Sequence, residues 1–194
     1  MSKVVWKGGT LLAPVPPVMV SCGDMEKSNI ITIAWTGVLN SNPPKTYISV
    51  RPQRHSFGII KEKKEFVINL TPASLVKEAD YCGIYTGAKV DKFEKCKFTK
   101  GEASTVACPL IEECPMNLEC KVTDIVELGS HHMFIADITA INVDEALLGD
   151  DGKLHLEKAK LAAFAHGEYY ELGKKIGNFG FSVKKKKSKK YNKK

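Results

Sequence analysis

The chain has 194 residues, of which 43% are hydrophobic and 26% charged, with a formal charge of +7. These proportions are typical of a globular protein and exclude collagen, a chain disordered throughout and a bundle of membrane-spanning helices. The charge is uneven, because residues 184–194 hold eight of the 29 basic residues and no acidic one, so the other 21 basic residues face 22 acidic residues. We therefore expect a near-neutral domain over residues 1–183 and a disordered lysine-rich tail over residues 184–194.

Near the start of the chain, an apolar run from Leu11 to Val20 precedes Cys22, an order that superficially matches a signal peptide ending at a lipid-modified cysteine. Pro14, Pro16 and Pro17 interrupt this run and would break an apolar helix. No stretch reaches the roughly 18 unbroken apolar residues of a transmembrane helix. We expect a cytoplasmic protein without a membrane segment.

Short apolar and β-branched runs predict six strands. These runs span residues 17–22, 29–36, 45–50, 65–70, 117–128 and 132–143. In the second run the alternation places Ile31, Ile33 and Trp35 on one face of the strand. The last two runs flank Gly129 and Ser130, which predicts a hairpin.

Helical spacing is found in fewer places. The segment Ser56–Lys64 begins with a residue that favours the N-cap position, Ser74–Cys82 has an apolar face, and Lys158–Ala165 is a weaker candidate. Strands connected by short helices predict a mainly β fold, a β-barrel with short helical insertions, and not a doubly wound sheet.

The six cysteines contain no C-x-x-C pair. Cys108, Cys114 and Cys120 recur every six residues, but metal and iron–sulfur sites usually contain closer pairs. We therefore predict reduced thiols and no metal site.

Arginine occurs only twice in the chain, as Arg51 and Arg54, and both precede the first predicted helix together with His55 and Ser56. The guanidinium group is planar and always charged, and it pairs well with phosphate or carboxylate. Two arginines at a helix N-terminus therefore indicate an anion pocket. A solvated turn capped by Ser56 explains the segment alone equally well.

Upstream, the segment Thr32–Gly37 ends a predicted strand in small residues that let a flat ligand approach the backbone. Trp35 would supply an aromatic surface for such a ligand, although a tryptophan in a strand more often belongs to the core. No G-x-G-x-x-G or Walker sequence is present, so a nicotinamide cofactor would bind without a Rossmann domain.

Taken together in this order, the segments resemble the flavin reductase-like family with an FMN-binding split barrel, and in particular its flavoredoxin branch. The resemblance covers nearly the whole chain up to the tail. The matching segments are PPVMVSCGD at 16–24, NIITIAWTG at 29–37, SNPPKTYISVRPQRHS at 41–56, EFVINL at 65–70, CGIYTGAKVDKF at 82–93, SHHMFIADI at 130–138 and YYELGKKIGNFG at 169–180.

This resemblance implies a set of FMN-binding residues and no catalytic side chain. Strand alternation allows only one of the adjacent His131 and His132 to face the site, and we choose His131. His55 stands where relatives often have an aromatic residue. Without the resemblance, Lys92 would be read as a solvated lysine and Phe164 as core. With it, Phe164 is expected to contact the ring across a dimer interface.

 The implied cofactor-binding residues are Asn29, Thr32, Ala34, Trp35, Thr36, Ser49, Arg51, Arg54, His55, Ser56, Lys92, His131 and Phe164.

The resemblance further implies an oxidoreductase that binds FMN, accepts a hydride from NADH or NADPH and passes electrons to free flavin, a ferric complex or a protein partner. An electron carrier of the flavoredoxin type, without NAD(P)H turnover, is the alternative. The segment 86–93 is expected to cover the flavin, and a homodimer with the flavin near its interface is expected. A nucleic-acid-binding protein that uses the lysine tail is a distant alternative, because the rest of the chain has no motif that reads RNA or DNA.

Overall fold

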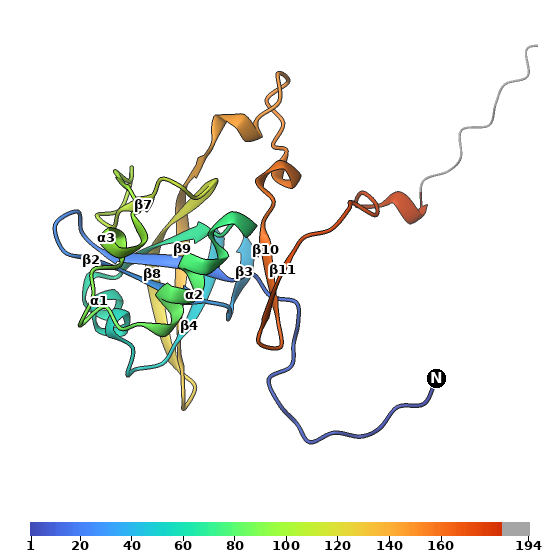
Figure 1. Ribbon diagram of the computed structural model, residues 1–194, viewed down its shortest axis with the longest axis horizontal. Coiled ribbons are helices and arrows are strands. Elements are labelled where there is room, and N and C mark those ends of the chain that lie inside the picture. Colours follow the sequence, from blue (N-terminus) through green and yellow to red (C-terminus); the bar gives the residue numbers. More distant parts are fainter. Residues whose placement is uncertain (184–194) are drawn as a thin grey trace, which may run out of the picture.

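The computed structural model describes residues 1–183, and the predicted tail at 184–194 lies outside the described residues. Seven antiparallel strands form one sheet in the order β2-β1-β5-β8-β9-β4-β3 (Figure 1). The strands are β1 Val18–Gly23, β2 Ser28–Ile33, β3 Thr36–Ser41, β4 Pro44–Val50, β5 Glu65–Leu70, β8 Met116–Glu127 and β9 His132–Val143. The prediction of a mainly β fold is confirmed.

The sheet curves so that strands distant in its order approach one another. The backbone N–H of Ser49 in β4 donates a hydrogen bond of 2.9 Å to the carbonyl oxygen of Trp35, which follows β2. β8 and β9 form the predicted hairpin, with irregular register between Glu119 and Cys120 and again between Val122 and Asp124. Such irregularities increase the local bend and twist of a strand pair.

Helices lie in the connections between strands. α1 His55–Lys63 connects β4 to β5, whereas α2 Val76–Ile84 and α3 Lys92–Cys96 lie between β5 and β8. Two further strand pairs and four short helical turns complete the described chain. These are β6 Lys100–Gly101 with β7 Leu110–Ile111, β10 Ala162–Ala165 with β11 Glu168–Glu171, and η1 Ala73–Leu75, η2 Glu145–Leu147, η3 Leu156–Ala159 and η4 Phe181–Val183.

Both faces of β1 are buried, because neighbouring side chains of the strand enter different clusters. Val18 and Val20 pack in the main core with Phe57 and Ile60 of α1. Met19 points to the opposite face, where it packs with side chains of α2 and α3. Burial on two faces explains why this strand has no regular polar alternation. Its one polar side chain, Ser21, is buried and donates a hydrogen bond of 2.6 Å to the carbonyl oxygen of Pro109.

The prediction of a helix over Lys158–Ala165 is wrong. The segment divides between η3 and β10, and β10 pairs with β11. Phe164 also bridges to Val15 through two backbone hydrogen bonds of 2.8 and 2.9 Å. Pairing with segments distant in the sequence therefore overrides the local helical spacing.

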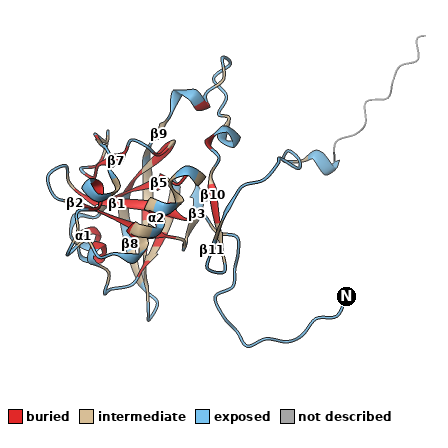
Figure 2. Ribbon diagram, viewed as in Figure 1, coloured by how far each residue is buried: buried red, intermediate tan, exposed pale blue. Residues whose placement is uncertain are grey.

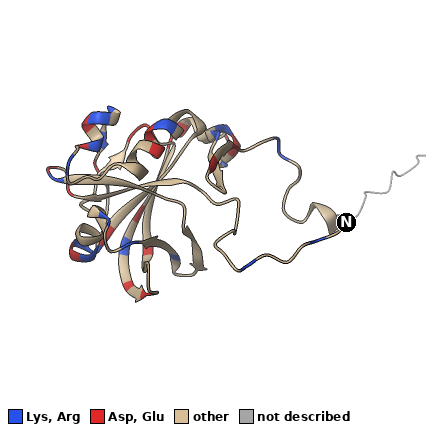
Figure 3. Ribbon diagram, turned by 60° about the horizontal axis from the view of Figure 1, so that its bottom comes forward, with Lys and Arg blue, Asp and Glu red and all other residues tan. Residues whose placement is uncertain are grey.

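Two terminal segments leave the body of the molecule, residues 1–14 and residues 176–183 (Figures 1 and 2). Their apolar side chains are exposed, including Trp6, Leu12 and Phe179. Over the body, Lys and Arg are interspersed with Asp and Glu (Figure 3). Among the helices of residues 1–183, none has the length and hydropathy needed to cross a membrane.

Candidate functional site

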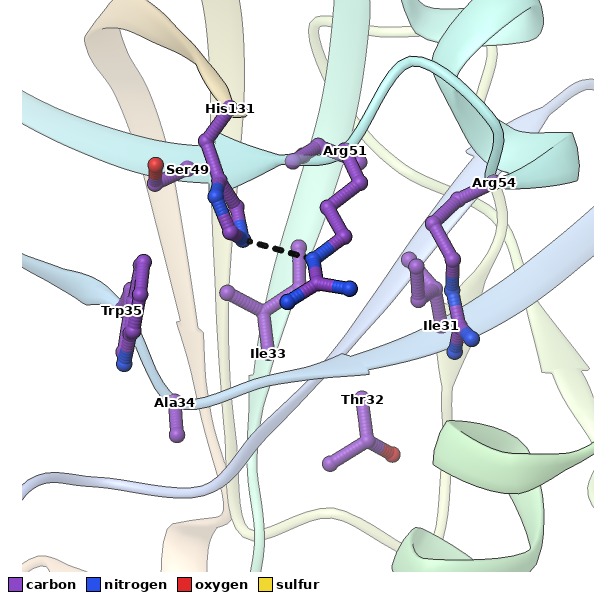
Figure 4. A pocket seen from close by; sticks show the side chains of 10 residues that line it. Ile31, Thr32, Ile33, Ala34, Trp35, Ser49, Arg51, Arg54 and His131 are labelled. Carbon is purple, nitrogen blue, oxygen red and sulfur yellow. Dashed lines mark hydrogen bonds between the residues drawn. The ribbon is translucent and has the colours of Figure 1, made fainter. Parts of the chain in front are cut away.

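A pocket of about 270 Å³, here called the aromatic pocket, opens where β2 and β4 end. Figure 4 shows Thr32, Ala34 and Trp35 along one side and Arg51 and His131 facing them from the other. The lining residues are Ile31, Thr32, Ile33, Ala34, Trp35, Ser49, Val50, Arg51, Arg54 and His131. The pocket therefore combines an apolar floor with two guanidinium groups.

Trp35 is 42% exposed and lines this pocket, so the alternative interpretation of Trp35 as a core residue is wrong. β2 ends at Ile33, so the alternation that buries Ile31 and Ile33 stops before Trp35. The indole lies instead 4.5 Å from the imidazole of His131, measured between ring centroids, with the rings tilted by 35°. These two rings give the pocket an aromatic edge that a flat ligand can contact.

His131 also contacts Arg51, whose Nε donates a hydrogen bond of 3.4 Å to Nε2 of the imidazole (Figure 4). Burial, and then the positive charge of Arg51, lower the pKa of His131 below its ordinary value. A neutral imidazole therefore accepts the hydrogen bond at neutral pH. His132 packs edge-on against Phe57 at 5.0 Å and is absent from the lining of this pocket.

A second pocket of about 90 Å³, here called the polar pocket, adjoins the first and shares Ile31 and Arg54 with it. Its lining comes from β2, the start of α1, the loop after α2 and the start of α3. The lining residues are Asn29, Ile31, Gln53, Arg54, His55, Ser56, Tyr85, Thr86, Gly87 and Lys92. The two pockets together form one elongated site with an aromatic end and a polar end.

Lys92 is a buried cation at the polar end, with only 3% of its surface exposed. Its Nζ donates hydrogen bonds to the carbonyl oxygens of Ile30, at 2.5 Å, and Cys82, at 2.8 Å. Burial, helped by the nearby charge of Arg54, lowers the pKa of Lys92 to about 8. The interpretation of Lys92 as a solvated lysine is therefore wrong.

Arg54 is the second cation of the polar pocket and donates a hydrogen bond to the carbonyl oxygen of Gly83. Arg54, and not Ser56, is the N-cap residue of α1, which corrects the predicted capping role. Ser56 lies inside the first turn, 1% exposed, and its hydroxyl accepts a hydrogen bond of 2.7 Å from Asn29. No side chain caps α1 and its first turn holds no acidic residue.

Within residues 1–183, neither arginine nor Lys92 forms a salt bridge. A buried ammonium without a carboxylate partner has a high desolvation cost. An anion at this place would offset that cost, and the uncapped N-terminus of α1 favours the same charge. The donor set therefore fits a phosphate at the polar end and a flat ring at the aromatic end, which is the arrangement that FMN requires.

The structure brings eleven of the thirteen predicted residues to this site. Seven line the aromatic pocket and five the polar pocket, with Arg54 counted in both. The two exceptions are Thr36 and Phe164. Thr36 lies in β3 and its hydroxyl donates a hydrogen bond of 2.5 Å to the carbonyl oxygen of Tyr47, whereas Phe164 packs against Tyr169 at 5.1 Å.

Sequence reasoning did not assign Gln53, Tyr85, Thr86 and Gly87 to the site, although all four line the polar pocket. Gln53 lies between the two arginines, and Thr86 and Gly87 belong to the loop predicted to cover a flavin. Their place within those two segments was the available signal, because none of these residue types alone indicates phosphate binding.

A family model described as the flavin reductase like domain matches residues 11–173 of this chain. Among curated proteins, an uncharacterized protein of Archaeoglobus fulgidus is 34% identical over 142 residues, covering 73% of this chain and 78% of its own length. A more distant relative is the NADPH-flavin oxidoreductase of Streptomyces viridifaciens, 22% identical over 134 residues and covering 68% of each chain.

Two solved structures that are similar to this chain are flavoredoxins. The flavoredoxin of Desulfovibrio vulgaris (Miyazaki F) has a TM-score of 0.87 and 32% identity, covering 94% of this chain and 100% of its own. The flavoredoxin of Methanosarcina acetivorans has a TM-score of 0.86 and 26% identity, covering 95% and 100%. These similarities agree with the predicted split barrel and with the flavoredoxin branch.

Proposed function

This chain belongs to the flavin reductase-like family and is similar in structure to its flavoredoxin branch. We therefore propose that it binds FMN in the aromatic and polar pockets and acts as an oxidoreductase. One observation carries this proposal. The polar pocket holds a buried lysine and an arginine without a carboxylate partner in the described chain, and it shares Ile31 and Arg54 with the aromatic pocket.

Each part of the site has its own task in this proposal. Lys92, Arg54 and the first turn of α1 hold the phosphate, and Ser56 is positioned there by Asn29. Trp35 and the buried Ile31 and Ile33 supply apolar surface for the ring. When bound, FMN supplies a ring system that accepts hydride and returns electrons singly or in pairs.

Arg51 adds positive charge at the aromatic end and is held there by its hydrogen bond to His131. A cation near the ring favours the anionic state of a flavin. Because this effect is electrostatic, no side chain needs to act as a general acid or base. We propose no catalytic residue in the sense of proton transfer.

NADH or NADPH is the electron donor in the leading form of this proposal. The similarity to the NADPH-flavin oxidoreductase of Streptomyces viridifaciens supports this form. The electron acceptor would be free flavin, a ferric complex or a protein. The similarity to two flavoredoxins favours a second form, in which the chain carries electrons between redox proteins without NAD(P)H turnover.

Anaerobic mixing separates these two forms. The purified protein is loaded with FMN and mixed with NADH or NADPH while the flavin absorbance is followed. Rapid loss of the oxidised flavin band with either nucleotide supports the reductase. An unchanged band with both, together with full bleaching by dithionite, supports the carrier.

We also propose a homodimer with the flavin near its interface. The surface beside the aromatic pocket carries exposed apolar side chains, Trp35 at 42%, Val38 at 79% and Leu39 at 46% exposure. The terminal segments add further exposed apolar surface away from the body (Figure 2). A patch of this kind marks an interaction site. Sedimentation at micromolar concentration tests this proposal, with a monomer as the contradicting result.

A further inference from the structure

Two thiols lie in contact beside the polar pocket. The Sγ atoms of Cys82 in α2 and Cys96 in α3 are 3.8 Å apart. All six cysteines are within the described residues and are free, and this pair is their one thiol–thiol contact. A disulfide needs an S–S distance of about 2.05 Å, so bond formation requires the two sulfur atoms to approach through rotation of the side chains, a displacement of α2 and α3, or both.

The pair can be reached from solvent through Cys96. This residue lines a groove of about 590 Å³ with Tyr81, Tyr85 and Lys95, whereas Cys82 is fully buried beneath it. Tyr85 lines both this groove and the polar pocket. A small oxidant can therefore reach Cys96 without passing through the flavin site.

The backbone next to Cys82 anchors both cations of the polar pocket. The carbonyl oxygen of Cys82 accepts a hydrogen bond of 2.8 Å from Lys92, and the carbonyl oxygen of Gly83 accepts one from Arg54. α3 begins with Lys92 and ends with Cys96. Any displacement that closes the thiol pair therefore acts on the elements that place these cations.

We propose that Cys82 and Cys96 form a reversible disulfide and that its formation weakens FMN binding at the polar pocket. The disulfide itself is independent of the proposed function, whereas its effect on FMN rests on that function. The oxidant is a hydroperoxide, a class of molecule that acts on accessible cysteine thiolates.

Cys96 reacts first, because it is partly exposed whereas Cys82 is buried. Lys92 and Lys95 favour its thiolate, whereas burial and the carboxylate of Glu78 in α2 oppose it. Its thiolate attacks one peroxide oxygen, the O–O bond breaks, and water or an alcohol leaves with both bonding electrons, giving a sulfenic acid. The sulfur of Cys82 then attacks the Cys96 sulfur, the S–O bond breaks and water leaves. The two thiols lose two electrons in total, and the peroxide gains them.

Burial raises the pKa of both thiols, so at neutral pH they are largely protonated. Because only the thiolate attacks, the disulfide should form faster as the pH increases.

The test uses the full-length protein, reduced and free of FMN, treated with hydrogen peroxide at several pH values. We expect the loss of two free thiols, a peptide pair linked through Cys82 and Cys96, and full reversal by dithiothreitol. FMN affinity should fall about tenfold on oxidation, as expected for the loss of one charge-assisted hydrogen bond, and return on reduction.

Two variants control the test. Cys114→Ser, in the same apolar cluster but without a thiol neighbour, should still form the linked pair, whereas Cys96→Ser should not. Absence of the linked peptide in the wild-type protein overturns the disulfide. A linked peptide with unchanged FMN affinity overturns the coupling. If the reduced protein binds no FMN, the proposed function is contradicted, and so is the effect of the disulfide on FMN binding. The formation of the linked peptide then still decides whether the disulfide itself exists.

Discussion

The side-chain amide of Asn29 donates a hydrogen bond of 2.7 Å to the hydroxyl of Ser56. Asn29 belongs to β2 and Ser56 to the first turn of α1, so this bond ties the helix start to the sheet beneath the polar pocket. Both residues are buried, at 4% and 1% exposure. A Cβ atom at Gly87 would collide with the carboxamide of this asparagine.

The variant Gly87→Ala should therefore displace Asn29 or the loop after α2 and weaken FMN binding about tenfold, the effect of losing one well-placed hydrogen bond. Isothermal titration with FMN measures the change. Gly58→Ala is the matched control, because a Cβ in α1 at that position meets nothing within 4 Å. It should leave FMN affinity unchanged and raise stability by about 0.5–1 kcal/mol.

Arg54→Gln removes the cation that both pockets share. We expect the dissociation constant for FMN to increase by about 10- to 100-fold, since a charge-assisted hydrogen bond contributes about 1.5–3 kcal/mol. Lys61→Gln, at an exposed position of the same helix, is the control and should bind FMN as the wild type does. If Arg54→Gln and Lys61→Gln bind FMN with equal affinity, Arg54 does not contact the phosphate.

Lys92 should make both stability and FMN affinity depend on pH, in opposite directions. Its pKa is about 8 in the folded protein without ligand and ordinarily 10.5, so the unfolded chain binds more protons between these values. Lys92 therefore increases the free energy of unfolding of the apoprotein as the pH rises from 8 to 10.5. FMN affinity falls over the same range, because the phosphate loses its cationic partner.

Titrations with FMN from pH 7 to pH 9.5 measure this second effect, which should approach about tenfold per pH unit above pH 8. Riboflavin, which lacks the phosphate, and the variant Lys92→Met provide the controls. A decrease of the same size in either control would show that another group titrates.

Glu119 tests the fold independently of the flavin. This carboxylate is fully buried and accepts hydrogen bonds from Ser104, Thr105 and Asn142. Burial acts to raise its pKa, but these hydrogen bonds outweigh burial and lower the pKa to about 2.

Glu119→Gln should lower the free energy of unfolding by about 1–3 kcal/mol at pH 7, because a buried set of donors loses its charged acceptor. The folded pKa is depressed, so this stabilisation is present above pH 4.5 and is lost as the pH falls towards 2. Urea denaturation at pH 7 and at pH 3 measures the difference, with the exposed Glu127→Gln as control. A difference that does not shrink in acid would contradict the pKa shift.

Much of the architecture follows from local sequence pattern. The strands at 65–70 and 132–143 have the predicted bounds, because β-branched runs between turn residues indicate strands strongly. The helix candidate at 158–165 failed, since its strand pairing depends on Val15 and on β11, which a local window does not contain. The strand predicted at 29–36 ends earlier, at Ile33, because a period of two does not reveal where a strand ends.

The site was predictable to the extent that it lies in continuous segments. Arg51 and Arg54 were singled out by composition, and the resemblance to a family supplied Asn29, Lys92 and His131. Sequence alone did not show that Lys92 is buried, because burial here depends on the carbonyl groups of Ile30 and Cys82 from two other elements. The placement of Phe164 relative to a flavin remains a prediction tied to the proposed dimer.

The central claim is that a buried lysine and an arginine hold the phosphate of FMN. Parallel isothermal titrations of the wild-type protein with FMN and with riboflavin test it most directly. We predict one FMN per chain, bound about 100-fold or more tightly than riboflavin, and a preference that largely disappears in Lys92→Met and Arg54→Gln. Equal affinity for FMN and riboflavin, or an unchanged preference in both variants, would contradict the claim.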